Sequence, residues 1–280
     1  MSLSIFTSAS SMASTNALNK SNSMLSTAME RLGTGKRINS AADDAAGLQI
    51  ATRLQGQSNG MTVAKRNISD ATAMLQTAEG SFDEVTNILY RMKDLATQSA
   101  NDTNTQKDRD SLQAEYSELN KELDNIMSNT SYGGEKLLSA SGKLSNSMSF
   151  QIGSSSGETL KLDLKTSLTA VSGAMTTVSG LTLNATASGS NAAITQIQDA
   201  LDTVGSMRSS LGANINRLGH TAANLANMQD NTNLALGNIQ DADFASEASS
   251  MTRNQMLAQT SMSMLKQSNS MSGMVMSLLG

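Results

Sequence analysis

The 280-residue sequence has no cysteine, no proline and no tryptophan, and each absence removes a class of protein. Without cysteine there is no disulfide, no thiolate nucleophile and no sulfur ligand for a metal. Because proline disrupts helix interiors, its absence permits very long helices. Aromatic residues make up only 2% of the chain, whereas a compact enzyme of this size normally has more aromatic bulk in its core. The composition therefore favours long helices over a compact enzyme.

Charge and hydropathy exclude two kinds of partner. The net charge is −4 and the isoelectric point is near 5.1, which argues against nucleic acid. No apolar run approaches the roughly 20 residues of a membrane-spanning helix, so we expect no membrane partner. The first ten residues have neither a basic region nor an apolar run, so we expect no cleavable signal peptide.

The residues that usually perform catalysis are also scarce. His220 is the only histidine, and no histidine or cysteine companion completes a zinc site with it. The many serines lack both a nucleophile elbow and a histidine base nearby in the sequence. We therefore predict a protein that is not an enzyme and has no cofactor and no metal.

A glycine-containing stretch from Gly33 to Asp44 admits two interpretations. A phosphate-binding loop needs Gly-x-x-x-x-Gly-Lys-Ser/Thr after a buried strand, but here Arg37 replaces the hydroxyl and no apolar strand precedes the loop. Ser40-Ala-Ala-Asp43 instead fits a capping box, with acids near the positive end of a helix. We predict a flexible break over Gly33–Asn39 and a helix that begins at Ser40.

A seven-residue repeat is the strongest signal in the chain. Apolar residues stand seven apart, and a second set follows three residues after the first. Such a repeat predicts a supercoiled helix over Ser40–Ser99, about 90 Å long. The first set is Leu54, Met61, Ile68, Leu75, Phe82, Leu89 and Ala96, and the second is Ala64, Ala71, Ala78, Val85 and Met92.

Two more long helices are expected from alternating spacings of four and three residues. The first follows "ANDTNTQ" and carries Leu112, Tyr116, Leu119, Leu123 and Ile126. The second carries Ile194, Ile197, Leu201, Val204, Leu211, Ile215, Leu218, Ala222 and Leu225. Together with the heptad helix they predict a mainly α protein, a long coiled-coil-like helical bundle.

Amphipathic patterns also occur at both ends of the chain. Apolar faces are costly to leave in water, so these patterns predict paired terminal segments that are buried in an assembly. Their residues are Leu18, Leu25, Met29 and Leu32 at one end, and Phe244, Met251, Leu257, Met264, Leu265, Met271, Val275 and Leu278 at the other.

The middle of the chain has a different character. Met148, Phe150 and Ile152 alternate with polar residues, as do Leu160, Leu162 and Leu164 after a Gly/Ser-rich turn, which predicts a β-hairpin over 148–164. Residues 166–190 are rich in Ser, Thr, Gly and Ala, and predict a weakly structured surface segment.

Several long motifs together resemble the bacterial flagellin family. They include "MERLGTGKRINSAADDAAGLQIATRL", "LQTAEGSFDEVTNILYRMKDLATQSANDTNT", "ELDNIMSNTSYGGEKLL" and "SSLGANINRLGHTAANLANMQDN", and they cover roughly residues 1–165 and 192–280. The final segment departs from the family, which often has a proline where this chain reads "SNSMSGMVM".

The resemblance implies an extracellular filament subunit that polymerises with copies of itself and is exported by the flagellar type III apparatus. It implies an inner tube of residues 1–39 and 241–280, and an outer tube of residues 40–240. Gly33, Gly35, Ser40 and Asp43 would then belong to the connection between the tubes. The short segment 166–190 would stand in place of the family's variable outer domains.

The same resemblance implies further partners. These are the flagellar cap, hook-associated proteins, an export chaperone and a host Toll-like receptor. The receptor contacts of the family fall on Arg91, Leu95 and Glu115. Leu95 lies beside a position of the heptad repeat, so it also fits a packing residue.

Two alternatives share parts of this pattern. A hook–filament junction protein has flagellin-like ends, but its central region diverges where this chain keeps "RMKDLATQSANDTNT". A coiled-coil signalling module would explain the heptads but not the amphipathic ends, the hairpin or the glycine break.

Overall fold

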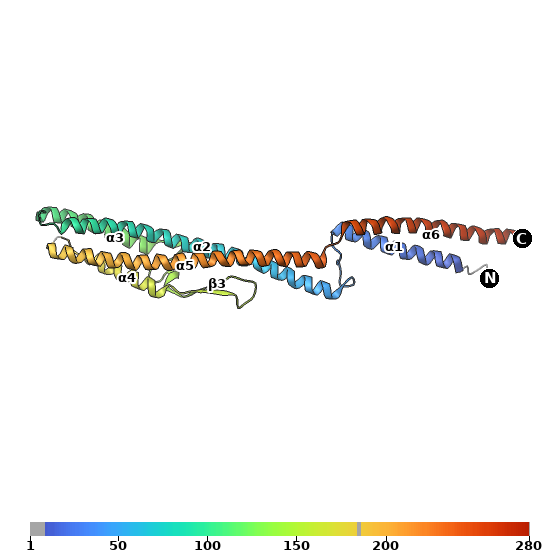
Figure 1. Cartoon of the computed structure of the whole chain (residues 1–280), viewed down its shortest axis with the longest axis horizontal. Coiled ribbons are helices and arrows are strands. Elements are labelled where there is room, and N and C mark those ends of the chain that lie inside the picture. The colour runs from blue at the N-terminus through green and yellow to red at the C-terminus, as the bar shows by residue number, and fades with distance from the viewer. Residues whose placement is uncertain (1–8, 184–185, 280) are drawn as a thin grey trace. The chain divides into compact units, whose positions relative to one another are not determined.

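The chain is mainly helical, as predicted, with two small antiparallel hairpins. The computed structural model describes residues 9–183 and 186–279, and Figure 1 shows the arrangement of their helices. The chain forms two compact units, the first from its two ends, up to Gln57 and from Asp230, and the second from Ser58–Gln229.

The core of the second unit is built on two long helices, α2 (Ala45–Ser99) and α5 (Ala187–Gln240). At 1.5 Å per residue, α2 is about 80 Å long. From Met61 to Ala96, every α2 residue of the two heptad sets is buried, whereas Leu54, in the first unit, is half-buried. On α5 the buried partners include Ile197, Val204, Leu211, Leu218 and Leu225.

Helix α3 (Gln106–Asn129) is positioned by its first residues and by one tyrosine. The Thr105 side chain accepts from the backbone N–H of Asp108, and the Asp108 carboxylate accepts from the backbone N–H of Thr105, which completes a capping box. The Tyr116 side chain is fully buried, and its hydroxyl donates to the carbonyl of Val178 at 2.9 Å. Burial raises the pKa of Tyr116, so this hydroxyl keeps its proton.

The predicted hairpin is present, and a second, shorter one precedes it. Strands β3 (Met148–Gln151) and β4 (Thr159–Leu162) pair Met148 with Leu162 and Phe150 with Leu160. This register places the apolar side chains on one face, toward the core. Strands β1 (Ser131–Tyr132) and β2 (Glu135–Lys136) meet at two glycines with positive φ, Gly133 and Gly134, as a tight hairpin turn requires. The short 3-10 helix η1 (Lys143–Ser145) follows.

The prediction of a weakly structured segment over residues 166–190 is wrong for its first half. Residues Lys165–Ser179 form helix α4, and its buried side chains are Leu168, Val171, Met175 and Val178. These four residues recur at spacings of three and four, so they form one apolar stripe on a helix. The surrounding Ser, Thr and Gly residues concealed that period. Leu183, beyond α4, is also buried.

Candidate assembly surface on the terminal helices

The two ends of the chain pair with each other, as predicted. Helix α1 (Ala9–Thr34) and helix α6 (Phe244–Leu279) lie side by side in Figure 1 and run antiparallel. At one end of the pair Arg31 Nη1 forms an ion pair with Glu247 Oε1 at 2.9 Å. At the other end the hydroxyls of Ser10 and Ser268 are 3.0 Å apart. These contacts fix the register of the two helices.

Small residues form the seam between α1 and α6. The buried residues of the pair are Ser21 and Ala28 on α1, and Asn254, Ala258 and Ser261 on α6. The flanking large residues Leu18, Leu25, Leu32, Met251 and Leu265 are only half-buried. Small side chains let two helices approach closely but bury little apolar area. Hydrophobicity alone does not reveal this seam, although its α6 residues recur at spacings of four and three and its α1 residues at a spacing of seven.

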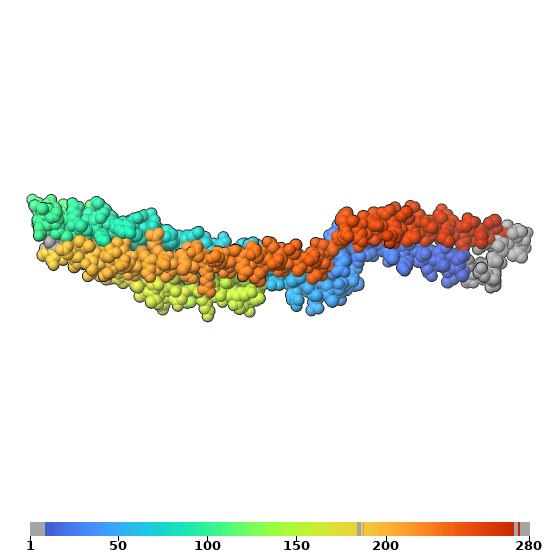
Figure 2. Space-filling model, in the orientation of Figure 1, coloured from blue at the N-terminus to red at the C-terminus, as the bar shows by residue number. Residues whose placement is uncertain are grey.

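The larger predicted side chains lie outside the seam. Phe244 is 63% exposed and Met264 is 60% exposed, and Met29, Leu257 and Met271 are also exposed. Leu257, Met264 and Met271 stand seven residues apart, so they form one line on α6 that we call the outer stripe. The side chains of Val275 and Leu278 lie outside the described residues. Figure 2 shows α6 alongside α1, with much of its surface uncovered.

The predicted break after α1 exists, but it is held in place rather than flexible. Gly35 has a φ of +71°, a conformation that favours glycine, and its carbonyl accepts from Ala242 N at 3.0 Å. Arg37 N donates to the carbonyl of Gln240 at 2.7 Å, and Ile38 is buried. Gly33 is exposed and belongs to the last turn of α1. Two chain segments therefore pair where the sequence suggested a loose linker.

The start of α2 also differs from the prediction. The helix begins at Ala45, and its cap is Asp44, whose Oδ1 accepts from Gly47 N at 2.8 Å. Ser40 and Asp43 form a separate turn, in which Asp43 Oδ2 accepts from Ser40 N at 2.9 Å. The hydrogen bonds of the predicted box are thus partly made, but one turn ahead of the helix. Asp44 caps the helix because it immediately precedes the first helical residue, Ala45.

Hydrogen bonds also lower the pKa of the aspartate in this turn. The backbone N–H groups of Ser40 and Asn39 and the Ser40 hydroxyl hold the pKa of Asp43 below its usual value. An aspartate is ionised at neutral pH in any case, and these hydrogen bonds stabilise the turn with the carboxylate in that form.

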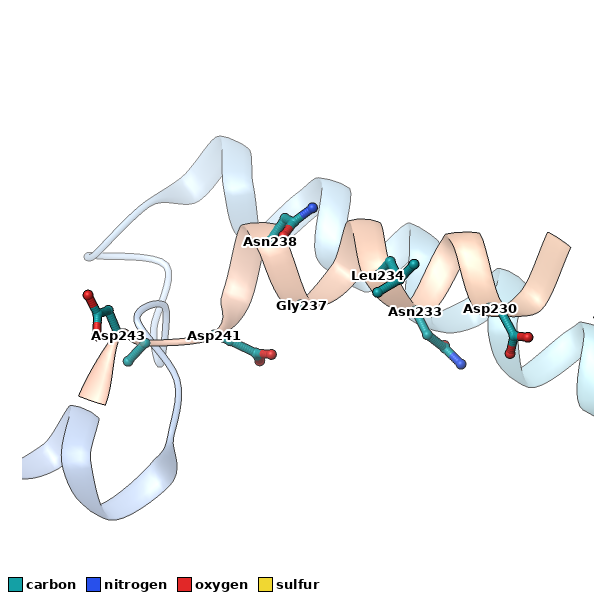
Figure 3. A pocket seen from close by; sticks show the side chains of 8 residues that line it. Asp230, Asn233, Leu234, Gly237, Asn238, Asp241 and Asp243 are labelled. Carbon is teal, nitrogen blue, oxygen red and sulfur yellow. The ribbon is translucent and has the colours of Figure 1, made fainter. Parts of the chain in front are cut away.

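An open hollow of about 780 Å³ lies on the first unit beside the end of α5. Its lining includes Asp230, Asn233, Leu234, Asp241 and Asp243. Figure 3 shows that the three carboxylates do not converge on one point. Among residues 9–183 and 186–279, no group of three or more histidine, aspartate or glutamate side chains is arranged to hold a metal ion. No described helix is long and apolar enough to span a membrane.

The three predicted receptor contacts are not equivalent in the structure. Arg91 and Glu115 are exposed and joined by an ion pair of 2.6 Å. Leu95 is 1% exposed, so its side chain is part of the core in this structure, and the contact role that the resemblance implies for it stays a prediction. A core position on α2 explains this residue, since it lies beside Ala96 in the heptad repeat.

Comparison with known proteins identifies the family. Residues 5–143 match the bacterial flagellin N-terminal helical region, and residues 194–279 match the bacterial flagellin C-terminal helical region. Flagellin B of Vibrio anguillarum is 33% identical over 379 aligned positions that include all of both chains. A flagellin of Halalkalibacterium halodurans is 40% identical over 253 residues, which are 90% of each chain.

Solved structures agree with the sequence comparison. The crystal structure of Bacillus cereus flagellin matches with a TM-score of 0.50 and 32% identity, covering 57% of this chain and 88% of that one. A putative flagellar hook-associated protein from Vibrio parahaemolyticus matches with a TM-score of 0.58 over 71% of this chain and all of its own. At 15% identity the second match shows only a shared fold, so the hook–filament junction alternative is not favoured. The chain belongs to the bacterial flagellin family and is a non-enzymatic structural subunit of the extracellular flagellar filament.

Proposed function

We propose that the α1–α6 pair is the surface through which this subunit polymerises, and that the outer stripe packs against neighbouring copies. The observation that supports this proposal is a set of large, exposed apolar side chains on a pair of helices with few charges. Exposed apolar surface of this kind marks an interaction site on a soluble protein. A second copy presents the same apolar surface, so it is a partner of matching chemistry.

The distribution of charge supports this surface. The charged residues of α1 and α6 are Lys20, Glu30, Arg31, Glu247, Arg253 and Lys266. Arg31 and Glu247 neutralise each other, and no charged residue occurs between Arg253 and Lys266. Charged residues are depleted at the cores of protein interfaces, because an unpaired charge is costly to bury. Residues 254–265, which include Met264, therefore have the composition of an interface core.

A charge placed in the outer stripe tests the proposal. Met264→Glu is expected to stop elongation from filament seeds, whereas Met264→Leu keeps an apolar side chain and is expected to elongate normally. Met228→Glu is a matched control, because Met228 is an exposed methionine of the second unit. Far-UV circular dichroism checks that each monomer is folded. If Met264→Glu elongates as fast as the wild type, the outer stripe is not an assembly contact.

The division into an inner tube of residues 1–39 and 241–280 and an outer tube of residues 40–240 is part of this proposal. So is the idea that the chain is a short form. The alignment with the Vibrio anguillarum flagellin has 379 positions, whereas this chain has 280 residues, so 99 positions of the alignment have no residue in this chain. Residues 144–193 fall between the two matched family regions, and they include the segment 166–190. Export, cap, chaperone and hook-associated partners rest on the resemblance.

Receptor binding by Arg91 and Glu115 is a second proposal from the resemblance. Both side chains are about half exposed, so a partner can reach them. Arg91→Ala is expected to weaken binding of the monomer to the receptor by more than about tenfold, which is typical of a central interface arginine. Arg53→Ala removes another exposed arginine of α2 and serves as the control. If the Arg91→Ala variant and the wild type bind the receptor with equal affinity, Arg91 is not part of the receptor-binding site.

A further inference from the structure

The methionines of this chain divide by exposure. The sequence has 19, an unusual supply of oxidisable sulfur in a protein without cysteine. Met61, Met92 and Met207 are fully buried in the core of the second unit. By contrast, Met264 and Met271 are 60% and 54% exposed. Further exposed methionines on the same two helices are Met12, Met24, Met29, Met256, Met262 and Met274.

Exposure decides which of these thioethers an oxidant reaches. With hydrogen peroxide, the sulfur lone pair attacks one peroxide oxygen and the O–O bond breaks. Oxygen is transferred to sulfur, which gives methionine sulfoxide, and the peroxide is reduced to water. The product is polar and is a strong hydrogen-bond acceptor, whereas the thioether is apolar and adaptable. An apolar contact that is stable with methionine is therefore destabilised by the sulfoxide, because the sulfoxide oxygen would be buried without a hydrogen-bond donor.

We propose that Met264 and Met271 are oxidation sites at which a peroxide blocks the free subunit from adding to a filament. The inference rests on the proposed function, because only packing of the outer stripe makes these sulfurs matter. Lys266 is the only charged residue of α6 after Arg253, and its spacing of two residues from Met264 and five from Met271 places it on another face of the helix from both sulfurs. Methionine sulfoxide reductases reverse the reaction, so the block is reversible. Oxidation acts on the monomer, and assembly protects the same sulfurs.

Peptide mapping by mass spectrometry tests the site. Monomer and preformed filaments are treated with hydrogen peroxide, and sulfoxide formation is followed at each methionine. In the monomer, Met264 and Met271 are expected to oxidise at least about tenfold faster than Met92 and Met207, because oxidation follows exposure. In filaments their rate is expected to fall toward that of the buried methionines. Equal rates at exposed and core methionines, or no protection in filaments, would overturn the proposal.

Polymerisation tests the consequence. Oxidised wild-type monomer is expected to elongate seeds at least about tenfold more slowly, and reductase treatment to restore the rate. The double variant Met264→Leu, Met271→Leu has no sulfur in the outer stripe and is expected to elongate equally well before and after peroxide. Met228→Leu removes an exposed sulfur of the second unit and is expected to remain sensitive.

The outcomes separate this inference from the proposed function. If oxidised wild type elongates normally although Met264 and Met271 are fully converted, the oxidation proposal is wrong. If the double variant remains sensitive to peroxide, the two residues are the wrong ones. The assembly surface fails by a different result, namely normal elongation of Met264→Glu without any oxidant.

Discussion

At the scale of single residues, Gly47 determines how the connection after α1 packs on the start of α2. A Cβ placed on Gly47 would lie 2.7 Å from Ile38 Cδ1 and would also clash with the Asp44 carboxylate. Ile38 is fully buried and Asp44 caps the helix, so neither side chain moves without a loss. The close approach therefore requires glycine at this position.

Gly47→Ala is expected to destabilise the segment 35–48 by about 1–3 kcal/mol, the usual cost of overpacking. Gly56→Ala is the matched control, because Gly56 lies on the same helix and no atom beyond its chain neighbours and the local helix backbone lies within 4 Å of its Cβ position. The control is expected to gain up to about 1 kcal/mol from helix propensity. Native-state hydrogen exchange measures both changes. Equal exchange in the two variants would contradict the close contact.

Asp43 makes the same segment sensitive to acid. Its pKa is lower in the folded chain than in the unfolded chain, so its contribution to stability is present above about pH 4 and disappears as the pH falls through the lowered pKa. The amide protons of Asn39 and Ser40, which donate to Asp43, are expected to shift with this titration in NMR spectra. Asp43→Asn is expected to abolish the shift. A midpoint at or above the ordinary aspartate value would contradict these hydrogen bonds.

At the scale of elements, the heptad repeat of α2 is the best-determined feature. Phe82 and Leu89 are fully buried, and they contribute to one core cluster with α3, α4 and α5. A seven-residue repeat predicts such a face because every seventh residue returns to nearly the same side of a helix. The spacing of the apolar residues is sufficient to predict α2, α3, α5 and the β3–β4 hairpin.

Phe82→Ala is expected to destabilise the second unit by about 3–5 kcal/mol, through lost burial and the cavity that remains. Tyr90→Ala is the control on the same helix, since Tyr90 is an exposed aromatic residue, and it is expected to cost less than about 1 kcal/mol. Chemical denaturation followed by circular dichroism measures the difference. Similar losses in both variants would contradict the assignment of the buried face.

Periodicity failed where small or polar residues obscured it. Helix α4 lies in a stretch dominated by Ser, Thr and Gly. Its four buried apolar residues stabilise the helix by packing in the core of the second unit. The observed start of α2 at Ala45 lies five residues after the predicted start at Ser40, because the Asp44 carboxylate, and not the Ser40 side chain, accepts from the first turn of the helix. Local capping rules do not fix the residue at which a helix begins. For α2, the packing of Ile38 beside Gly47 fixes it.

At the scale of the whole molecule, the two units differ in what stabilises them. The seam of α1 and α6 consists of Ser, Ala and Asn side chains, whereas the second unit buries Phe, Leu, Met, Ile and Val. Buried apolar area is the main favourable contribution to folding, so the terminal pair is the weaker structure in a single subunit.

Thermal unfolding of dilute monomer is therefore expected to show two transitions, the α1–α6 pair first and the second unit later. A variant that ends at Asp243 lacks α6 and is expected to lose the first transition and keep the second. Calorimetry of both proteins, below the concentration at which filaments form, makes the comparison. One cooperative transition that moves as a whole after truncation would contradict two separate units.

Composition, heptad spacing and motif resemblance were sufficient for the mainly helical class, the long helices, the hairpin and the family. They were sufficient because each depends on residues close together in the chain. The tertiary structure decided that small residues face each other between α1 and α6, that the outer stripe stays exposed, and that Leu95 is buried. The first two outcomes depend on pairing between segments more than 200 residues apart, as in the contact of Arg31 with Glu247, and the third depends on the packing of α2 in the core of the second unit. An amphipathic pattern shows that one face of a helix is stabilised by burial. Only the fold determines which face is covered within the chain and which is left for another copy.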